Sequence, residues 1–288
     1  MPERRSPCRF GAILGSAILV VSLLSTLPAA ESRQVSAAND IQLIVRGDDI
    51  GMAQAINEAC IKCYREGIER SVEIVVPGPW FLDAVRLLKE NPGLDVGVHL
   101  TLTCEWDGVK WRPLTAAPTL VDDNGHFHPT TSGFLRAQPR LEDVEQELRA
   151  QITLAKKHIP QVSHLSAHMG TATASPALRS LVQRLATEYN LPLEIEAAGR
   201  VRWNAGATAA ERESTLVDAL ENLQPGRWLL VEHPGLETPE MRNIQHPGNN
   251  DVAAVRAAVT AAFTSPRVQE VIQRRGIKLV SYADLQAK

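Results

Sequence analysis

The chain has 288 residues, of which 44% are hydrophobic and 22% charged, which is enough to enclose a sizeable core in one globular domain. The net charge of −3 and the lack of a basic block after residue 40 argue against a nucleic-acid-binding protein. Beyond the N-terminal segment there are three cysteines, Cys60, Cys63 and Cys104, and this odd number argues against a disulfide scaffold.

The first 37 residues have the pattern of an export signal. Arg4, Arg5 and Arg9 precede an apolar stretch over residues 10–27, and small residues at 28–30 and 35–37 offer cleavage sites. We therefore expect a signal peptide over 1–37, a mature domain over 41–288, and an exported, periplasmic or extracellular protein. The alternative is an uncleaved signal anchor, because about 18 apolar residues approach the length of a membrane span.

Mass spectrometry of the protein purified from its native host tests this expectation. We expect a chain that lacks about the first 30 to 37 residues, because signal peptides are cleaved after small residues. An intact terminus at Met1 would instead mean an anchor, or no export.

Strand-like and helix-like segments alternate along the rest of the chain. Strands are predicted near 41–46, 72–76, 95–102, 162–167, 192–196, 227–232 and 277–281, and helices near 53–66, 79–90, 141–158, 175–189, 208–223 and 251–275. Such alternation predicts a parallel sheet covered by helices, and about seven strands in one domain indicate a distorted or incomplete (β/α) TIM-like barrel. The long segments 104–140 and 234–250 are expected to rim its mouth.

The first strand-like run ends in two adjacent carboxylates, Asp48 and Asp49, followed by Gly51. Adjacent residues at a strand end are expected to diverge in direction, so that one carboxylate binds a metal while the other faces a reacting water. Two like charges this close repel each other, and a bound cation would keep both of them ionised.

Histidines lie on two later strand-like segments. His99 lies within 95–102, and His164 and His168 lie four residues apart around 162–167. Two histidines so far apart on one strand reach a single metal only if the strand bends, so we favour His168 at the carboxyl end and place His164 deeper in the barrel. One aspartate and two histidines suit zinc or a similar divalent ion and leave room for water and substrate.

These motifs, in this order, resemble the YdjC-like carbohydrate deacetylases, the family that includes chitooligosaccharide deacetylase. That family's pattern has an apolar strand ending in Ala-Asp-Asp-Phe-Gly, then Gly-x-His-x-x-Leu-Thr and then His-x-Asp-Ser-His. The corresponding stretches here are 47–51, 97–103 and 164–168, with further matches at His233-Pro234 and in the C-terminal stretch 264–282. The resemblance spans about residues 41 to 285.

The resemblance implies a TIM-like barrel and assigns roles to five residues. Metal ligands fall on Asp49, His99 and His168, the general base on Asp48, and an acid/base histidine on His233. It implies one divalent metal ion, zinc being favoured and magnesium the second choice. The implied reaction is the hydrolytic removal of N-acetyl groups from an acetylated amino sugar or oligosaccharide. It says nothing about oligomeric state.

The chain departs from the family pattern beside the last ligand. The Asp-Ser before the second metal histidine is replaced by Ser166-Ala167, and the histidines that usually follow are replaced by the stretch 169–173. We expect this to change the groups that support His168 and one wall of the sugar site. Two alternatives to N-deacetylation therefore stay open: a metal-dependent esterase or amidase with another acylated substrate, and a secreted, catalytically degenerate carbohydrate-binding protein.

Overall fold

The computed structural model describes residues 40–193, 199–203, 208–246, 248 and 251–286. The predicted signal peptide over 1–37 lies outside these ranges. The strands are β1 Ile41–Ile50, β2 Ser71–Ile74, β3 Asp95–Leu100, β4 Val162–Ala167, β5 Gly199–Arg200, β6 Gly226–Glu232 and β7 Lys278–Val280. The α-helices are α1 Gln54–Glu66, α2 Phe81–Lys89, α3 Thr131–Arg136, α4 Leu141–His158, α5 Pro176–Tyr189, α6 Ala209–Glu221, α7 Pro239–Arg242, α8 Val252–Phe263, α9 Pro266–Arg275 and α10 Tyr282–Gln286. Two short 3₁₀ turns, η1 Pro118–Leu120 and η2 His168–Thr173, complete the list.

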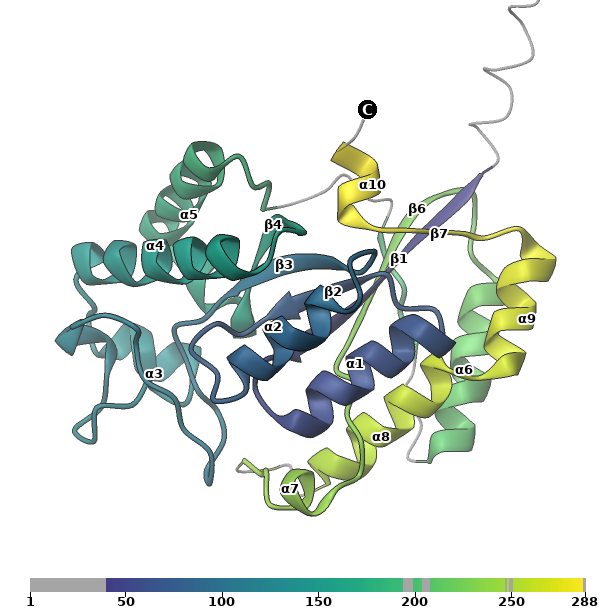
Figure 1. The fold of residues 1–288 in the computed structure, drawn as a ribbon, viewed down its shortest axis with the longest axis horizontal. Helices are drawn as coiled ribbons and strands as arrows, with labels where there is room; N and C mark the ends of the chain where they lie inside the picture. The colour runs from purple at the N-terminus through teal and green to yellow at the C-terminus, as the bar shows by residue number, and fades with distance from the viewer. Residues whose placement is uncertain (1–39, 194–198, 204–207, 247, 249–250, 287–288) are drawn as a thin grey trace, which may run out of the picture.

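All the strand pairs of the seven-stranded sheet are parallel, in the order β4-β3-β2-β1-β6-β5. The long strand β1 pairs with β6, and it also pairs with β2 towards its carboxyl end and with β7 towards its start. The sheet curls into a half-barrel, which confirms the predicted incomplete TIM-like barrel in one α/β domain (Figure 1). The carboxyl ends of β1, β3, β4 and β6 meet at one edge, where sites of such folds are built.

Helices cover the outside of the curled sheet. In Figure 1, α1 and α2 lie in front of the sheet, α4 and α5 lie at one end, and α6, α8 and α9 lie at the other. Buried aliphatic side chains fill the space between the sheet and this helical layer in two large clusters. The apolar faces of the strands and helices are thus buried against each other.

Most element boundaries agree with the sequence, but the helix predicted over 251–275 is wrong as one element. It divides into α8 and α9, because Pro266 has no amide hydrogen to continue a helix. The Ser265 side chain accepts from the Arg267 and Val268 amides and caps α9. The strand predicted at 192–196 lies partly outside the described residues; within them, the Pro192 carbonyl accepts the Leu165 amide of β4 at 2.9 Å.

The inside of the half-barrel is polar where a TIM barrel usually has layers of branched apolar side chains. Buried charged and polar residues there are Arg46, Asp48, Ser71, Glu73, Asp95, His99, His164 and Ser166. The Tyr282 ring stacks on the His164 ring at 3.7 Å and 7°, and the Tyr282 hydroxyl accepts from Arg46. The C-terminal segment thereby joins β1 to β4.

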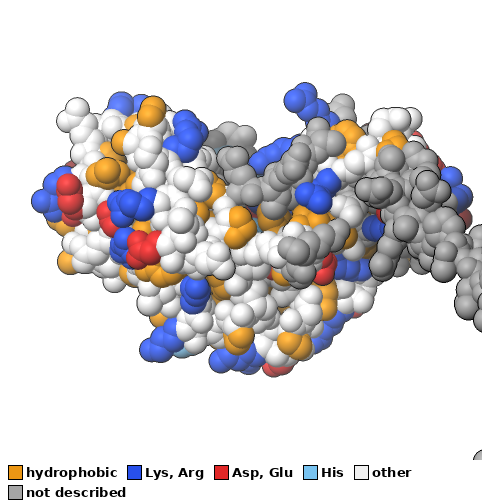
Figure 2. All heavy atoms as spheres, turned by 90° about the horizontal axis from the view of Figure 1, so that it is seen from above, with side chains coloured by type: hydrophobic (Ala, Val, Ile, Leu, Met, Phe, Trp, Pro, Cys, Tyr) orange, Lys and Arg blue, Asp and Glu red, His pale blue; other side chains and the backbone are white. Residues whose placement is uncertain are grey.

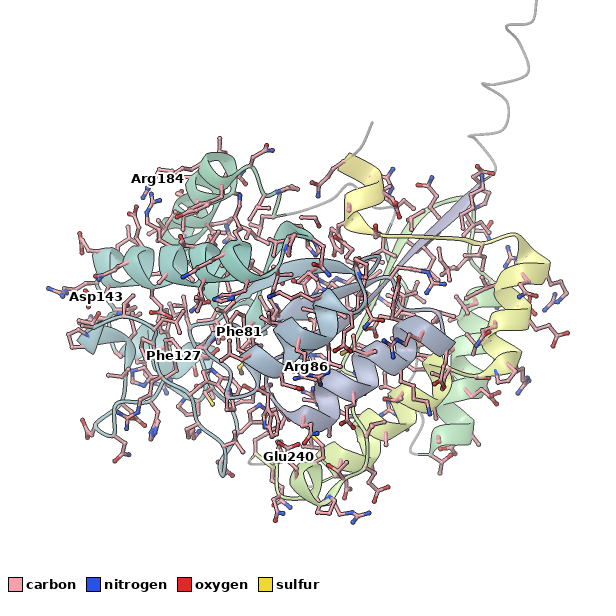
Figure 3. All side chains as sticks on the ribbon, in the orientation of Figure 1. Phe81, Arg86, Phe127, Asp143, Arg184 and Glu240 are labelled. Atoms are coloured by element: carbon pink, nitrogen blue, oxygen red, sulfur yellow. The ribbon has the colours of Figure 1, made fainter. Side chains whose placement is uncertain are left out.

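The segment 104–140 is anchored and not loose. Figure 3 labels Phe127 in this segment and Asp143 at the start of α4, near the same end of the molecule. The Phe127 side chain is fully buried, and Asp143 accepts the Thr119 hydroxyl at 2.7 Å. Fully buried Glu147 accepts the Leu114 and Thr115 amides. These contacts fix a wall beside the carboxyl ends of β3 and β4.

The surface drawn in Figure 2 shows basic and acidic side chains interspersed, with both signs side by side at the end formed by α4 and α5. There, Arg149 and Arg184 pair with Glu145, and Arg149 also pairs with Glu188. Such pairs at the surface add little to stability. Among the described residues, none of the helices has both the length and the apolar character that a membrane span requires.

Candidate functional site

The two adjacent aspartates at the end of β1 converge and do not diverge. The pairing register with β2 gains one residue between Asp48 and Ile50, and Asp49 has a left-handed backbone with φ of 80°. An extra residue in a strand re-aims its side chains, and a non-glycine residue with positive φ is held there by its surroundings. As a result, both carboxylates approach the same atom, His99 Nε2, at 3.8 Å and 3.7 Å. The expected divergence was wrong.

A guanidinium holds each of the two carboxylates. Arg46 donates from Nε and Nη2 to the two oxygens of Asp48, at 2.7 Å and 2.9 Å. Arg256 of α8 donates to Asp49 Oδ2 at 2.6 Å, while Asp49 Oδ1 is buried without a hydrogen-bond partner among the described residues. Although burial raises the pKa of Asp49, the Arg256 charge and His168 hold it well below its usual range.

His99 projects from β3 with one ring nitrogen engaged. Its Nδ1 lies 2.6 Å from Ser166 Oγ, and Ser166 donates its hydroxyl hydrogen to Glu73. Since the hydroxyl has one hydrogen, His99 must donate from Nδ1, which leaves the Nε2 lone pair facing Asp49 Oδ1. Burial lowers the pKa of His99 although Asp48 raises it, which favours this neutral ring.

His168 begins the turn η2 directly after β4. The strand ends there because Met169 and Gly170 both adopt left-handed conformations. The His168 Nε2 atom lies 3.0 Å from Glu105 Oε2, and the His168 Nδ1 atom lies 3.3 Å from Asp49 Oδ1. Burial opposes a charged ring, but Glu105 and Asp49 raise the pKa of His168 to about 10.

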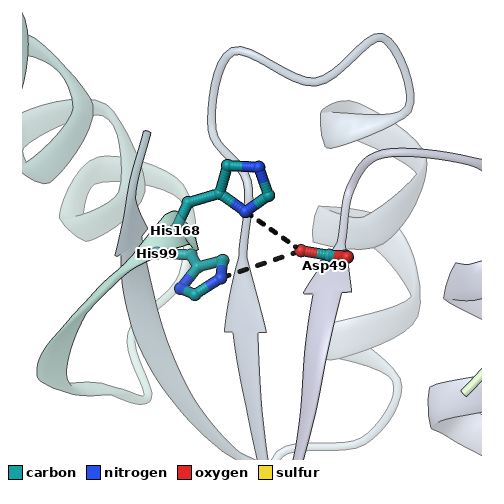
Figure 4. Close-up of side chains that lie close together, drawn as sticks. All are labelled: Asp49, His99 and His168. Carbon is teal, nitrogen blue, oxygen red and sulfur yellow. Dashed lines mark ion pairs between the residues drawn. The ribbon is translucent and has the colours of Figure 1, made fainter. Parts of the chain in front are cut away.

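Donor atoms of Asp49, His99 and His168 lie within 4.8 Å of one another, and all three side chains are buried (Figure 4). Asp49 Oδ1, which accepts no hydrogen bond within the described part of the chain, faces one nitrogen of each ring. A carboxylate oxygen and two imidazole nitrogens form a donor set for zinc or a similar divalent ion. These residues therefore fit a metal, with His99 offering Nε2 and His168 offering Nδ1.

The other two histidines of the sequence motifs take different places. His164 lies deeper in the half-barrel, donating to Glu73 Oε1 at 2.7 Å and stacking on Tyr282. His233 follows β6 and is exposed, lining a cavity of about 230 Å³ beside the three-residue cluster. That cavity is lined by Glu105, Trp106, Glu232, His233, His246, Val252, Val255, Arg256 and Val259.

Sequence reasoning missed four groups of the site. Arg46 could have been found from the sequence, since it lies two residues before Asp48 and so on the same side of β1. Glu105, Glu73 and Arg256 could not have been found in this way, because each reaches the site from another element. In this structure Ser166 contacts His99, and Glu105 supports His168. The expectation that Ser166-Ala167 changes the support of His168 relative to the family stays a prediction.

The protein is an open α/β barrel with a candidate metal cluster at the carboxyl ends of its strands. The family model described as YdjC-like protein matches residues 42–274, and the chain belongs to this family. A Thermus thermophilus relative named carbohydrate deacetylase is 35% identical over 80% of this chain and 89% of its own. One from Brevibacillus brevis, with the same name, is 28% identical over 85% and 100%.

A solved structure shares the fold over most of the chain. It is an Enterococcus faecalis protein provisionally named a cellobiose-phosphate cleavage protein, with a TM-score of 0.70 and 25% identity. The match covers 85% of this chain and 99% of that one.

The buried carboxylate of Glu73 predicts a pH dependence of stability. Burial raises the pKa of Glu73, but His164 and Arg46 lower it from 4.5 to about 2. A carboxyl group whose pKa falls on folding stabilises the protein above its unfolded-state pKa, and this contribution is lost as pH falls towards the folded value. We expect the stability advantage of wild type over Glu73→Gln to be full above about pH 4.5 and to shrink between pH 4.5 and 2. Urea unfolding at a series of pH values measures it, and a constant difference across that window would contradict the prediction.

Proposed function

We propose that the protein is a metal-dependent carbohydrate deacetylase that hydrolyses the N-acetyl group of an amino sugar or its oligosaccharides. The observation that carries this proposal is the buried Asp49 Oδ1, which accepts no hydrogen bond among the described residues but lies 3.7 Å and 3.3 Å from nitrogens of two imidazole rings, with a second carboxylate, Asp48, beside them. The names of the curated relatives support the substrate class.

The residues that would hold the ion are Asp49, His99 and His168, and their oxygen and nitrogen donors favour zinc, with magnesium as second choice. A bound ion would polarise the acetyl carbonyl and lower the pKa of a water molecule. Arg256 neutralises the far oxygen of Asp49, so that this carboxylate stays ionised and directed at the two rings. Glu105 accepts from His168 Nε2 and would hold that ring with its Nδ1 directed at the ion.

Asp48 is the proposed general base. Arg46 holds both of its oxygens, which fixes the plane of the carboxylate while each oxygen keeps a second lone pair. Asp48 Oδ2 lies 3.8 Å from His99 Nε2, close enough to the cluster to take a proton from a water bound beside it. Its role is thus to remove that proton as the water adds to the acetyl carbonyl carbon.

The cavity of about 230 Å³ beside the cluster is the proposed place of the substrate. Trp106 offers an indole ring there, with the Arg256 guanidinium over it at 5.2 Å and the His246 ring at 5.6 Å. His233 lies on the cavity wall and, when protonated, is the proposed donor to the departing amine nitrogen. The products are acetate and a free amino sugar.

Acetate release from a panel of acetylated sugars tests the proposal. Wild-type protein loaded with zinc should release acetate from N-acetylated amino sugars or chito-oligosaccharides and leave a free amine. Release only from O-acetylated sugars would replace the amide with an ester as the bond cleaved. Sugar binding without any acetate release would support the degenerate carbohydrate-binding protein instead. With the predicted export signal, the substrate would be met outside the cytoplasm.

A further inference from the structure

We infer that Glu73, acting through the Ser166 hydroxyl, supplies the negative charge that holds His99 in place as a ligand. Glu73 is therefore a positioning residue, on a strand that contributes no ligand itself. This inference rests on the proposed metal site, but not on the identity of the substrate.

The hydrogen-bonded series His99 Nδ1–Ser166 Oγ–Glu73 Oε2, called the relay below, has fixed hydrogen positions. Ser166 has a single hydroxyl hydrogen, which it gives to Glu73 Oε2, so its oxygen is left to accept from His99 Nδ1 at 2.6 Å. Glu73, ionised, can only accept. Glu73 thus fixes the direction of both hydrogen bonds. This direction selects the His99 tautomer that carries its hydrogen on Nδ1 and leaves the Nε2 that faces Asp49 unprotonated.

Glu73 is buried and is surrounded by groups that keep it charged. Its side chain is completely buried, and its other oxygen lies 2.7 Å from His164 Nε2 and 3.5 Å from Arg46 Nε. These groups keep the carboxylate charged in an interior that would otherwise neutralise it. A Cβ on Gly97 would lie 2.2 Å from Glu73 Oε2 and 2.4 Å from His164 Nε2, so the relay also requires glycine at that position.

The His99 and His168 rings differ in the group that lies behind each of them. His168 has a carboxylate directly behind it, Glu105 at 3.0 Å, whereas the group directly behind His99 is a neutral hydroxyl. The charge behind His99 lies one hydrogen bond further away, on Glu73 of β2, and the Ser166 hydroxyl carries its effect to the imidazole.

The inference is tested by zinc affinity, measured with the metal alone by competition with a chromophoric chelator. Glu73→Gln keeps the shape but not the charge, and should weaken zinc binding by about ten- to a hundredfold. Ser166→Ala, which breaks the relay while leaving the contacts of Glu73 with His164 and Arg46, should weaken it in the same direction. Glu69→Gln is the control for replacing a buried glutamate by glutamine, because Glu69 is equally buried but lies against Gly47 and outside the relay. It should bind zinc like wild type.

The decisive variant moves the carboxylate. Glu73→Gln/Ser166→Asp places one negative charge directly behind His99 and should return zinc affinity to the wild-type range, with the cobalt-substituted protein regaining the wild-type absorption spectrum. Unchanged affinity in Glu73→Gln, or no recovery in the double variant, would overturn the inference. If wild type binds zinc but releases no acetate, the proposed reaction fails while the relay is still decided by these affinities.

Discussion

Asp48→Asn should fold, retain its zinc and lose most of its acetate release. The asparagine can still accept a hydrogen bond from Arg46, so the local structure should survive, but an amide cannot take a proton from water. Removal of a general base commonly costs about 10²–10⁴-fold in rate. The measurement is a pair, metal content and acetate release, on the same preparation.

Asp49→Asn is the matched comparison, since it makes the same chemical change one residue later. It removes the charge facing both imidazoles and should lower metal occupancy, with activity returning in part at high zinc concentration. If Asp48→Asn is the variant that loses metal while Asp49→Asn stays loaded, the two roles are reversed. Near wild-type acetate release by Asp48→Asn would remove it as the base.

His168→Ala should reduce bound zinc from one ion per chain to almost none. This ring faces Asp49 with one nitrogen and Glu105 with the other, and its loss would leave only two of the three donors in place. Elemental analysis of the purified variant gives the metal content. Chelation should stop acetate release by the wild-type protein. Added zinc should then restore acetate release by the wild-type protein but should not produce it in His168→Ala.

His126→Ala is the control for that experiment. His126 lies in the segment 104–140, its amide is hydrogen-bonded to Asp122 in a local turn, and it is not one of the three clustered residues. It should keep one zinc per chain. Metal content that is unchanged in His168→Ala would exclude His168 from the site.

Local sequence was sufficient for most of the fold. Strand β4 and helix α4 agree with the sequence prediction at both ends, and the other predicted helices begin or end within a few residues of it, since apolar periodicity and capping residues act over single turns. The short helices α3, α7 and α10 were not predicted. The division of α8 from α9 was also readable in Ser265-Pro266, and treating 251–275 as one helix overlooked that stop signal. The strand near 192–196 stays a prediction.

The sequence by itself also determined which side chains stand at the strand ends. Asp48, Asp49, His99 and His168 follow from short motifs, because in a parallel sheet residues at the carboxyl ends of strands share one edge. Only the tertiary structure decided how they are aimed and supported. The extra residue at Asp49 turns two carboxylates toward one ring, and this depends on the register with β2. Arg256, Glu105 and Glu73 arrive from α8, a loop and β2, and no local pattern encodes such contacts, because they arise only when distant elements pack together.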